Sequence, residues 1–279
     1  MTPINKTRQK LGLALGGGGA KGLAHIGVLK TLKQEGITID FLAGTSIGSL
    51  VGGYFAAHLE VETLEKKILE KSDWRTGLSI FDPTLRRGIL KGKKIEHLVA
   101  EWIGTESFEE LLVPFTVVTT DLKSGAVVRL HQGDVVKAIR ASLSVPLVFQ
   151  PVPYNGMLLA DGGLSDPVPD DIVMDMGANK IISVNLDIGY FDDEYEKEKE
   201  MKLRDISLRT LNILRYHLAQ YCLNNSDIII EPDVDEHGLI GWNNFFDPEK
   251  AKKMIRKGEE ATCRILPNIK ELMNNGNFN

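Results

Sequence analysis

The sequence predicts an α/β protein with three layers, in which helices cover both faces of a mainly parallel, mixed central sheet. Two observations support this fold class. The order strand, helix, strand, helix with tight connections over residues 11–58 is typical of parallel sheets covered on both faces. Further β-branched runs of strand length then alternate with helical segments along the rest of the chain.

The predicted elements follow one another in short segments. A buried strand is expected in "KLGLALGG", and a helix in "AKGLAHIGVLKTLKQEG" with Gly36 as its stop signal. The second strand is expected in "ITIDFLAG" and the second helix in "SIGSLVGGYFAAHL". Later strands are expected in "VPFTVVTTDL", "KIISVNLDI" and "SDIIIEPDV", and later helices at residues 92–102, 134–141, 169–176, 203–223 and 248–264.

Two segments carry hairpin signals, which is why a mixed sheet is expected. "LKSGAVVRLHQGD" turns at Ser124-Gly125, and "PVPYNGMLLADGG" turns at the Asn-Gly pair of residues 155–156. Because the sequence shows no internal repeat or low-complexity tract, we expect one domain over residues 11–279, after a tail at residues 1–10. Its core at residues 11–187 carries the motifs, and C-terminal helices and a strand follow at residues 200–279.

Composition and charge argue against several functional classes. The chain has 279 residues, 43% hydrophobic and 25% charged, which suits a soluble globular protein. A net charge of -5 argues against nucleic acid as a partner. The two cysteines, Cys222 and Cys263, have neither a disulfide nor a zinc spacing, so we expect two buried free thiols. We also expect no metal and no cofactor.

The N-terminus imitates a secretory signal only briefly. In "MTPINKTRQKLGLALGGGGAKG" the apolar run is short, is diluted by glycine and meets Lys21. No segment approaches the roughly 18 to 20 apolar residues of a transmembrane helix. We therefore expect a cytoplasmic protein, and peripheral contact with the inner face of the membrane stays open.

The glycine cluster "GGGGAKG", residues 16–22, has three interpretations. Gly17, Gly19 and Gly22 satisfy the dinucleotide pattern G-x-G-x-x-G, with Asp40 as the acid that would bind the ribose. A Walker phosphate loop fails, because Lys21 precedes the last glycine. The third interpretation is an oxyanion hole, since glycines before a helix leave backbone N–H groups unobstructed by side chains.

The segment "GTSIG" favours the third interpretation. Ser46 lies between Gly44 and Gly48 at a strand-to-helix elbow, which strains the serine backbone and exposes its hydroxyl. In a parallel sheet the ends of the first two strands lie side by side, so Ser46 would face the glycine turn. A nucleophile would then face an anion hole, although the dinucleotide site remains an alternative.

A nucleophilic serine needs a base. No histidine lies in a loop that plainly converges on Ser46: the candidates are His25, His58, His97, His131, His217 and His237. His25, His58 and His97 are expected to be structural, whereas His131 and His237 stay open. Asp161 is the better candidate, because it ends an apolar run and is followed by two glycines that present the carboxylate into a site.

Four linked motifs resemble the patatin-like phospholipase family, bacterial branch. They are "GGGGAKGLAHIGVLK", "GTSIGSLVGG", "IRASLSVPLVFQPV" and "LADGGLSDPVP", in family order, and "DIIIEPDV" is a later counterpart. The resemblance implies a patatin-like fold and a dyad of Ser46 as nucleophile and Asp161 as base, without a catalytic histidine. It assigns the oxyanion hole to Gly17, Gly18 and Gly19, and supporting positions to Lys21, Gly22, Gly44, Gly48, Gly162 and Gly163.

The resemblance also implies a function. It predicts a serine acyl hydrolase that cleaves lipid carboxylic esters through an acyl-enzyme, acting on phospholipids, lysophospholipids or neutral acyl esters. The segment "DWRTGLSIFDPTLRRGIL", residues 73–90, suits a lid that touches an anionic surface, or an ordinary packed connection. The alternatives are a nucleotide-binding protein and a non-catalytic regulatory protein on the same fold, and the oligomeric state is left open.

Overall fold

The central sheet of the protein is mixed, as the sequence predicts. The computed structural model describes residues 9–70, 90–188, 202–234 and 247–274, and its sheet has eight strands in the order β5-β6-β3-β2-β1-β7-β8, with β4 paired to β3. Strands β1, β2, β3, β7 and β8 are parallel, and the hairpin strands are antiparallel. The strands are β1 (Leu11–Leu15), β2 (Phe41–Thr45), β3 (Phe115–Asp121), β4 (Val127–Leu130), β5 (Val152–Tyr154), β6 (Met157–Asp161), β7 (Lys180–Val184) and β8 (Ile228–Ile230).

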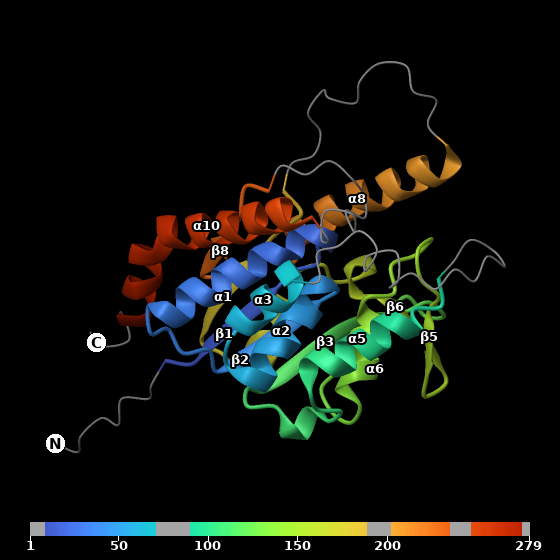
Figure 1. Ribbon diagram of the computed structural model, residues 1–279, viewed down its shortest axis with the longest axis horizontal. Coiled ribbons are helices and arrows are strands. Elements are labelled where there is room, and N and C mark those ends of the chain that lie inside the picture. The colour runs from blue at the N-terminus through green and yellow to red at the C-terminus, as the bar shows by residue number, and fades with distance from the viewer. Residues whose placement is uncertain (1–8, 71–89, 189–201, 235–246, 275–279) are drawn as a thin grey trace.

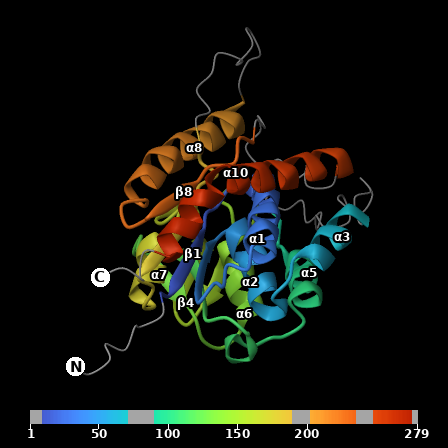
Figure 2. The same cartoon turned by 90° about the vertical axis from the view of Figure 1, so that its left-hand side faces the viewer.

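Helices cover both faces of this sheet. The α-helices are α1 (Ala24–Gln34), α2 (Ile47–His58), α3 (Glu62–Glu70), α5 (Lys93–Ile103), α6 (Val135–Ser142), α7 (Asp170–Asp175), α8 (Leu203–Tyr221) and α10 (Pro248–Asn274). Short 3-10 helices lie at η1 (Gly19–Leu23), η2 (Phe108–Glu110) and η3 (Gly162–Leu164). Figure 1 shows α8 and α10 along one side of the molecule, and Figure 2 shows α7 on the opposite side of the sheet from α1 and α2.

The two faces of the sheet bury side chains of different size. Successive strand residues point to opposite faces. In β1, Leu11, Leu13 and Leu15 therefore join the larger core beneath α1 and α2, whereas Ala14 joins a smaller cluster that includes Val173 of α7. Burial on both faces explains why the strands read as continuous apolar runs.

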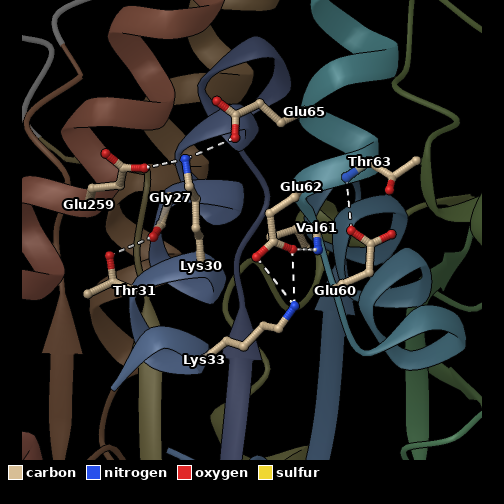
Figure 3. A network of polar contacts seen from close by, with 10 residues as sticks. All are labelled: Gly27, Lys30, Thr31, Lys33, Glu60, Val61, Glu62, Thr63, Glu65 and Glu259. Carbon is tan, nitrogen blue, oxygen red and sulfur yellow. Dashed lines mark hydrogen bonds and ion pairs between the residues drawn. The ribbon is translucent and has the colours of Figure 1, made fainter. Parts of the chain in front are cut away.

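Helix α3 was not predicted from the sequence. It lies beside α1, and Figure 3 shows the polar contacts that join α1, α3 and α10. Lys30 Nζ lies 3.1 Å from a Glu65 carboxylate oxygen and 2.9 Å from one of Glu259. The buried pair Leu64 and Ile68, four residues apart, was the helical signal that the sequence offered in this charged segment.

The C-terminal helix is longer than predicted. The sequence predicted that this helix ends at residue 264, before Pro267. Proline usually interrupts helical hydrogen bonding. The structure instead carries α10 through Pro267 to Asn274. Cys263 of this helix is exposed and Cys222 is half-buried, so the expectation of two buried thiols was wrong.

The C-terminal elements pack on the N-terminal ones. Helix α10 lies along α1, with an ion pair of 2.7 Å between Lys270 and Glu35, and β8 extends the sheet beside β7. On this ground we propose a single domain. Among the described helices, none combines the length and the apolar character that a membrane crossing requires. The segment considered as a lid, residues 73–90, lies outside the described residues except for Leu90.

Candidate active site

The strand register brings the ends of β2 and β6 together. Thr45, the last residue of β2, lies opposite Val118 of β3, and Asp161, the last residue of β6, lies opposite Thr119. Strand β4 pairs with these same two positions of β3, and a strand has only two edges. Strands β2 and β6 must therefore share the other edge of β3, so that the residue after Thr45 meets Asp161.

Ser46 and Asp161 form a short buried hydrogen bond. Ser46 Oγ donates to Asp161 Oδ2 at 2.6 Å, and each residue is only 4% exposed. The Gly163 N–H donates to the other carboxylate oxygen, Oδ1, at 2.7 Å. Both oxygens of the carboxylate are thus held, one by the hydroxyl and one by the turn that follows it.

The backbone of Ser46 is strained, as expected for an elbow. Its φ of 53° and ψ of -122° lie in a region that residues with side chains rarely adopt. The Ser46 N–H donates to Ser142 Oγ at 2.8 Å, and that hydroxyl donates to the Val118 carbonyl at 2.6 Å. Ser142 lies in the quoted motif "IRASLSVPLVFQPV", but the sequence analysis gave it no role.

The glycines around Ser46 allow α2 to approach the sheet closely. A Cβ atom on Gly48 would lie 2.2 Å from the Leu15 carbonyl oxygen, and one on Gly44 would lie 2.6 Å from the Gly48 carbonyl oxygen. Both distances are far below a normal van der Waals contact. Any side chain at either position would push α2 off the ends of β1 and β2, and the elbow with it.

The glycine turn after β1 is fixed from several sides. The N–H groups of Gly16 and Gly17 donate to the carbonyls of Val184 at 3.0 Å and Pro167 at 2.9 Å. His25 Nε2 lies 2.8 Å from the Gly16 carbonyl oxygen. Since this oxygen can only accept, Nε2 carries the proton, and burial lowers the pKa of His25 to about 4, which keeps the ring neutral.

This arrangement bears on the three glycines predicted for the oxyanion hole. The N–H of Gly17 is engaged with Pro167, so in this conformation the amides of Gly18 and Gly19 are the candidates. Gly19 lines the same cavity as Ser46. Gly22 lies against Ile47, and Gly162 lies against the Val118 carbonyl, so both supporting glycines pack close to the elbow.

The cavity beside Ser46 is mostly apolar. Helix α8 contributes part of its wall, although the sequence predicted this helix without placing it near the site. The wall also includes residues of the segment that follows α6. Its lining residues are Gly19, Ser46, Ile47, Leu143, Val145, Pro146, Asp161, Gly163, Leu164, Leu208, Leu211, Asn212 and Arg215.

Two charged side chains, Asp161 and Arg215, line this cavity. Burial raises the pKa of Asp161, and the charge of Arg215 opposes that rise. Arg215 Nη2 donates to both carboxylate oxygens of Asp187, at 2.9 and 2.8 Å. Lys21 donates to the Leu186 carbonyl at 3.2 Å, and burial lowers the pKa of Lys21 to about 7 against the opposing effect of Asp187.

The other candidates from the sequence lie elsewhere. Asp40 precedes β2 and accepts the Leu11 N–H at 2.9 Å, so it lies at the opposite end of the sheet from the glycine turn. Because Asp40 lies before β2 and far from the glycine turn, the dinucleotide interpretation loses the acid that would bind the ribose. His131 lines a separate pocket with Phe115, and His58 contacts the Trp102 carbonyl at 3.1 Å. His237 lies outside the described residues.

The described residues offer no metal centre. No group of three or more His, Cys, Asp or Glu side chains within residues 9–70, 90–188, 202–234 and 247–274 is placed to hold a metal ion. The chemistry that this part of the chain offers is that of a serine beside a carboxylate and a glycine turn.

Comparison with known proteins identifies similar sequences. An NTE family protein of Mycobacterium tuberculosis is 41% identical over 179 residues, which cover 63% of this chain and 49% of that protein. Neuropathy target esterase sws of Drosophila melanogaster is 34% identical over 193 residues, 67% of this chain and 13% of that protein. The match thus spans about half of the mycobacterial relative and a smaller part of the animal one.

A solved structure and a family model both match this chain. VipD from Legionella pneumophila superposes with a TM-score of 0.54 at 14% sequence identity, covering 94% of this chain and 67% of VipD, which shows a shared fold. The family model described as patatin-like phospholipase matches residues 13–174, more than half of the chain. The three-layer fold predicted from the sequence is therefore confirmed as patatin-like, and the chain belongs to the patatin-like phospholipase family.

Proposed function

We propose that this protein is a serine acyl hydrolase that cleaves carboxylic esters of lipids, with Ser46 as nucleophile and Asp161 as base. The observation that carries the proposal is the 2.6 Å hydrogen bond from Ser46 Oγ to Asp161 Oδ2 at a strained elbow. A hydroxyl bonded to a carboxylate in a dry site is the arrangement that activates a serine. Membership of a phospholipase family supports the same class of reaction.

The first half of the reaction forms an acyl-enzyme. Asp161 Oδ2 takes the hydroxyl proton while Ser46 Oγ attacks the ester carbonyl carbon, and the carbonyl oxygen becomes an oxyanion. The amides of Gly18 and Gly19 are the proposed donors to this oxyanion, because charge that develops in the transition state is best stabilised by fixed dipoles. The intermediate then collapses, the alcohol leaves with the proton from Asp161, and the acyl group stays on Ser46.

The second half of the reaction releases the fatty acid. A water molecule takes the place of the alcohol and gives a proton to Asp161 as it attacks the acyl carbonyl carbon. The ester bond to Ser46 then breaks, and the proton returns to Ser46 Oγ. The dyad ends in its starting state, so one carboxylate serves as base and as acid in both halves.

Burial makes the aspartate a better base. An ordinary aspartate, with a pKa of about 3.9, accepts a serine proton poorly. Burial raises the pKa of Asp161, while the hydrogen bonds from Ser46 and Gly163 favour its ionised form. The carboxylate is therefore more basic than a solvated one and is still available in the ionised state.

The cavity suits an acyl chain. Side chains such as Leu143, Val145, Leu208 and Leu211 form its apolar wall next to Ser46. A fatty acyl group would bury its methylene groups against them, and each buried methylene contributes about 0.8 kcal/mol. We therefore propose a phospholipid, a lysophospholipid or a neutral acyl ester as substrate.

We further propose that α8 contacts a lipid surface. Three large side chains of this helix, Leu203, Leu214 and Tyr221, are 79%, 60% and 75% exposed. Leu208 and Leu211 of the same helix line the cavity. A helix that is apolar toward solvent and toward the site suits an enzyme that takes its substrate from an interface.

The proposed function can be tested by trapping the acyl-enzyme. Purified protein is mixed with a medium-chain p-nitrophenyl ester, quenched in acid and digested, and the acyl mass is sought on the peptide that contains Ser46. We expect the acylated peptide and steady ester hydrolysis in the wild type, and neither in Ser46→Ala. Hydrolysis that survives Ser46→Ala would overturn the assignment of the nucleophile.

A further inference from the structure

The cavity is lined by an arginine, Arg215, that lies in none of the sequence motifs. Arg215 belongs to α8, which follows the motif-bearing core in the sequence. In the folded chain its side chain lines the cavity together with Ser46 and Asp161. Its side chain is 18% exposed, and that of its partner Asp187, which follows β7, is 8% exposed. An ion pair with so little solvent is screened far less than one at the surface.

Arg215 lies against both glycine turns of the site. Its Nε is 3.1 Å from the position that a Cβ atom would take on Gly163, the residue whose N–H holds Asp161. Its Nη2 is 3.2 Å from the corresponding position on Gly17 in the turn after β1. The guanidinium therefore spans from the turn after Asp161 to the proposed oxyanion turn, over two residues that have no side chain.

The charges around Asp161 oppose one another. Of the described charged groups, Arg215 of α8 and Asp187 after β7 affect the pKa of this carboxylate most, while Ser46 and Gly163 donate hydrogen bonds to it. Arg215 lowers the pKa of Asp161 against the effect of burial, and Asp187 raises it. Arg215 and Asp187 also act on Lys21 of η1: Asp187 raises the pKa of Lys21, and Arg215 lowers it.

We propose that Arg215 is a positioning residue of this site, whose guanidinium keeps the buried Asp161 carboxylate ionised and oriented toward Ser46. Asp187 holds the guanidinium in place through two hydrogen bonds to Nη2. The inference rests on the proposed roles of Ser46 and Asp161. It also gives α8 a part in the chemistry, because the helix delivers the charge as well as the apolar wall.

Mutations of Arg215 and of Asp187 are expected to shift the pH dependence of kcat/KM in opposite directions. Without the positive charge in Arg215→Gln, the Asp161 carboxylate takes up a proton at higher pH, so the acidic limb of kcat/KM moves to higher pH. Without the negative charge in Asp187→Asn, the limb moves to lower pH. A shift of about one pH unit makes Arg215→Gln about tenfold slower than the wild type well below the wild-type midpoint.

The experiment measures kcat/KM for a soluble p-nitrophenyl ester between pH 4 and pH 9, values chosen to bracket the buried carboxylate. Arg215→Lys, which retains the charge, is expected to stay near the wild-type midpoint, and Arg209→Gln on the same helix serves as the matched control. Circular dichroism checks that each variant is folded. If Arg215→Gln does not fold, Asp187→Asn still gives the sign of the shift, and Arg215→Lys still tests whether a positive charge at this position keeps the midpoint.

The outcomes separate this inference from the proposed function. Opposite shifts in Arg215→Gln and Asp187→Asn support the positioning role. A purely structural ion pair would lower the plateau rate in both variants without moving the midpoint, and that result would overturn the inference while the wild type stayed active. A wild type that neither hydrolyses esters nor becomes acylated on Ser46 would instead overturn the proposed function, and this inference with it.

Discussion

The Ser46 hydroxyl and the Asp161 carboxylate are 115 residues apart in the sequence and 2.6 Å apart in the structure. Strand β3 explains this proximity, because β2 leaves one of its edges at Val118 and β6 takes the same edge at Thr119. The dyad is thus positioned by strand register rather than by a local turn alone.

Ser142 is expected to hold the elbow. Ser142→Ala leaves the buried Ser46 N–H and the Val118 carbonyl without their shared partner. Such a loss costs about 1–3 kcal/mol per buried polar group, so we expect a lower free energy of unfolding together with a lower kcat. Urea unfolding and ester hydrolysis measure the two effects, with Ser124→Ala in the β3–β4 turn as control. Unchanged stability and rate would show that the elbow does not need this hydroxyl.

Gly48 is expected to tolerate substitution by alanine far less than Gly52, which lies four residues later in α2. A Cβ atom on Gly48 would meet the Leu15 carbonyl oxygen at 2.2 Å, whereas on Gly52 the nearest atom is a Leu15 side-chain carbon at 3.2 Å. We expect Gly48→Ala to lower the unfolding free energy by about 2 kcal/mol or more, or to prevent folding, because a backbone atom cannot move aside easily. Thermal unfolding compares the pair, and equal losses in both variants would contradict the close contact.

His25 is expected to make stability depend on pH. Its pKa is about 6.5 unfolded and about 4 in the folded protein, so only the unfolded chain binds the proton between these values. The stability from the neutral ring is present above the unfolded pKa and is lost as pH falls from about 6.5 to about 4, on the order of 3 kcal/mol in total. Urea unfolding of wild type and His25→Gln over this range should give a gap that narrows toward acid pH; a constant gap would exclude the titration of His25 as its cause.

The exposed apolar side chains of α8 are expected to affect activity only when the substrate lies in a lipid surface. Leu214→Ser removes an apolar side chain that is 60% exposed and does not line the cavity, so folding and the chemistry should be unaffected. We expect lower activity on phospholipid vesicles and unchanged activity on a soluble p-nitrophenyl ester. Thr210→Ser on the same helix is the matched control. Equal activities on vesicles for Leu214→Ser and wild type would argue against this surface.

The parts of the fold that local patterns encode were predictable from the sequence. The glycine turn, the elbow at Ser46 and the Asn-Gly hairpin before Asp161 each carry their signal within a few residues, and the structure contains all of them. The start of β2 was misjudged, because the apolar run "ITIDFLAG" does not show that pairing with β1 begins at Phe41 and leaves Asp40 outside the strand.

Side chains that reach the site through tertiary packing gave no local signal. Arg215 is one arginine in an amphipathic helix, and only the docking of α8 over η3 brings it to Asp161 and Asp187. Ser142 likewise reaches Ser46 only because α6 packs on β3. The sequence predicted the proposed nucleophile and the proposed base, whereas the groups that contact them through tertiary packing required the folded chain.

Labelling with a fluorophosphonate probe tests whether Asp161 activates Ser46, because such probes react with activated serines. Purified wild type, Ser46→Ala, Asp161→Asn and the control Ser124→Ala are labelled in parallel, and the adduct is located by peptide mapping. The account predicts one adduct on Ser46 in the wild type and in Ser124→Ala, none on this peptide in Ser46→Ala, and labelling slower by about 10² to 10⁴ in Asp161→Asn. A folded wild type that takes no label on Ser46, or that is labelled equally fast in Asp161→Asn, would contradict the proposed dyad.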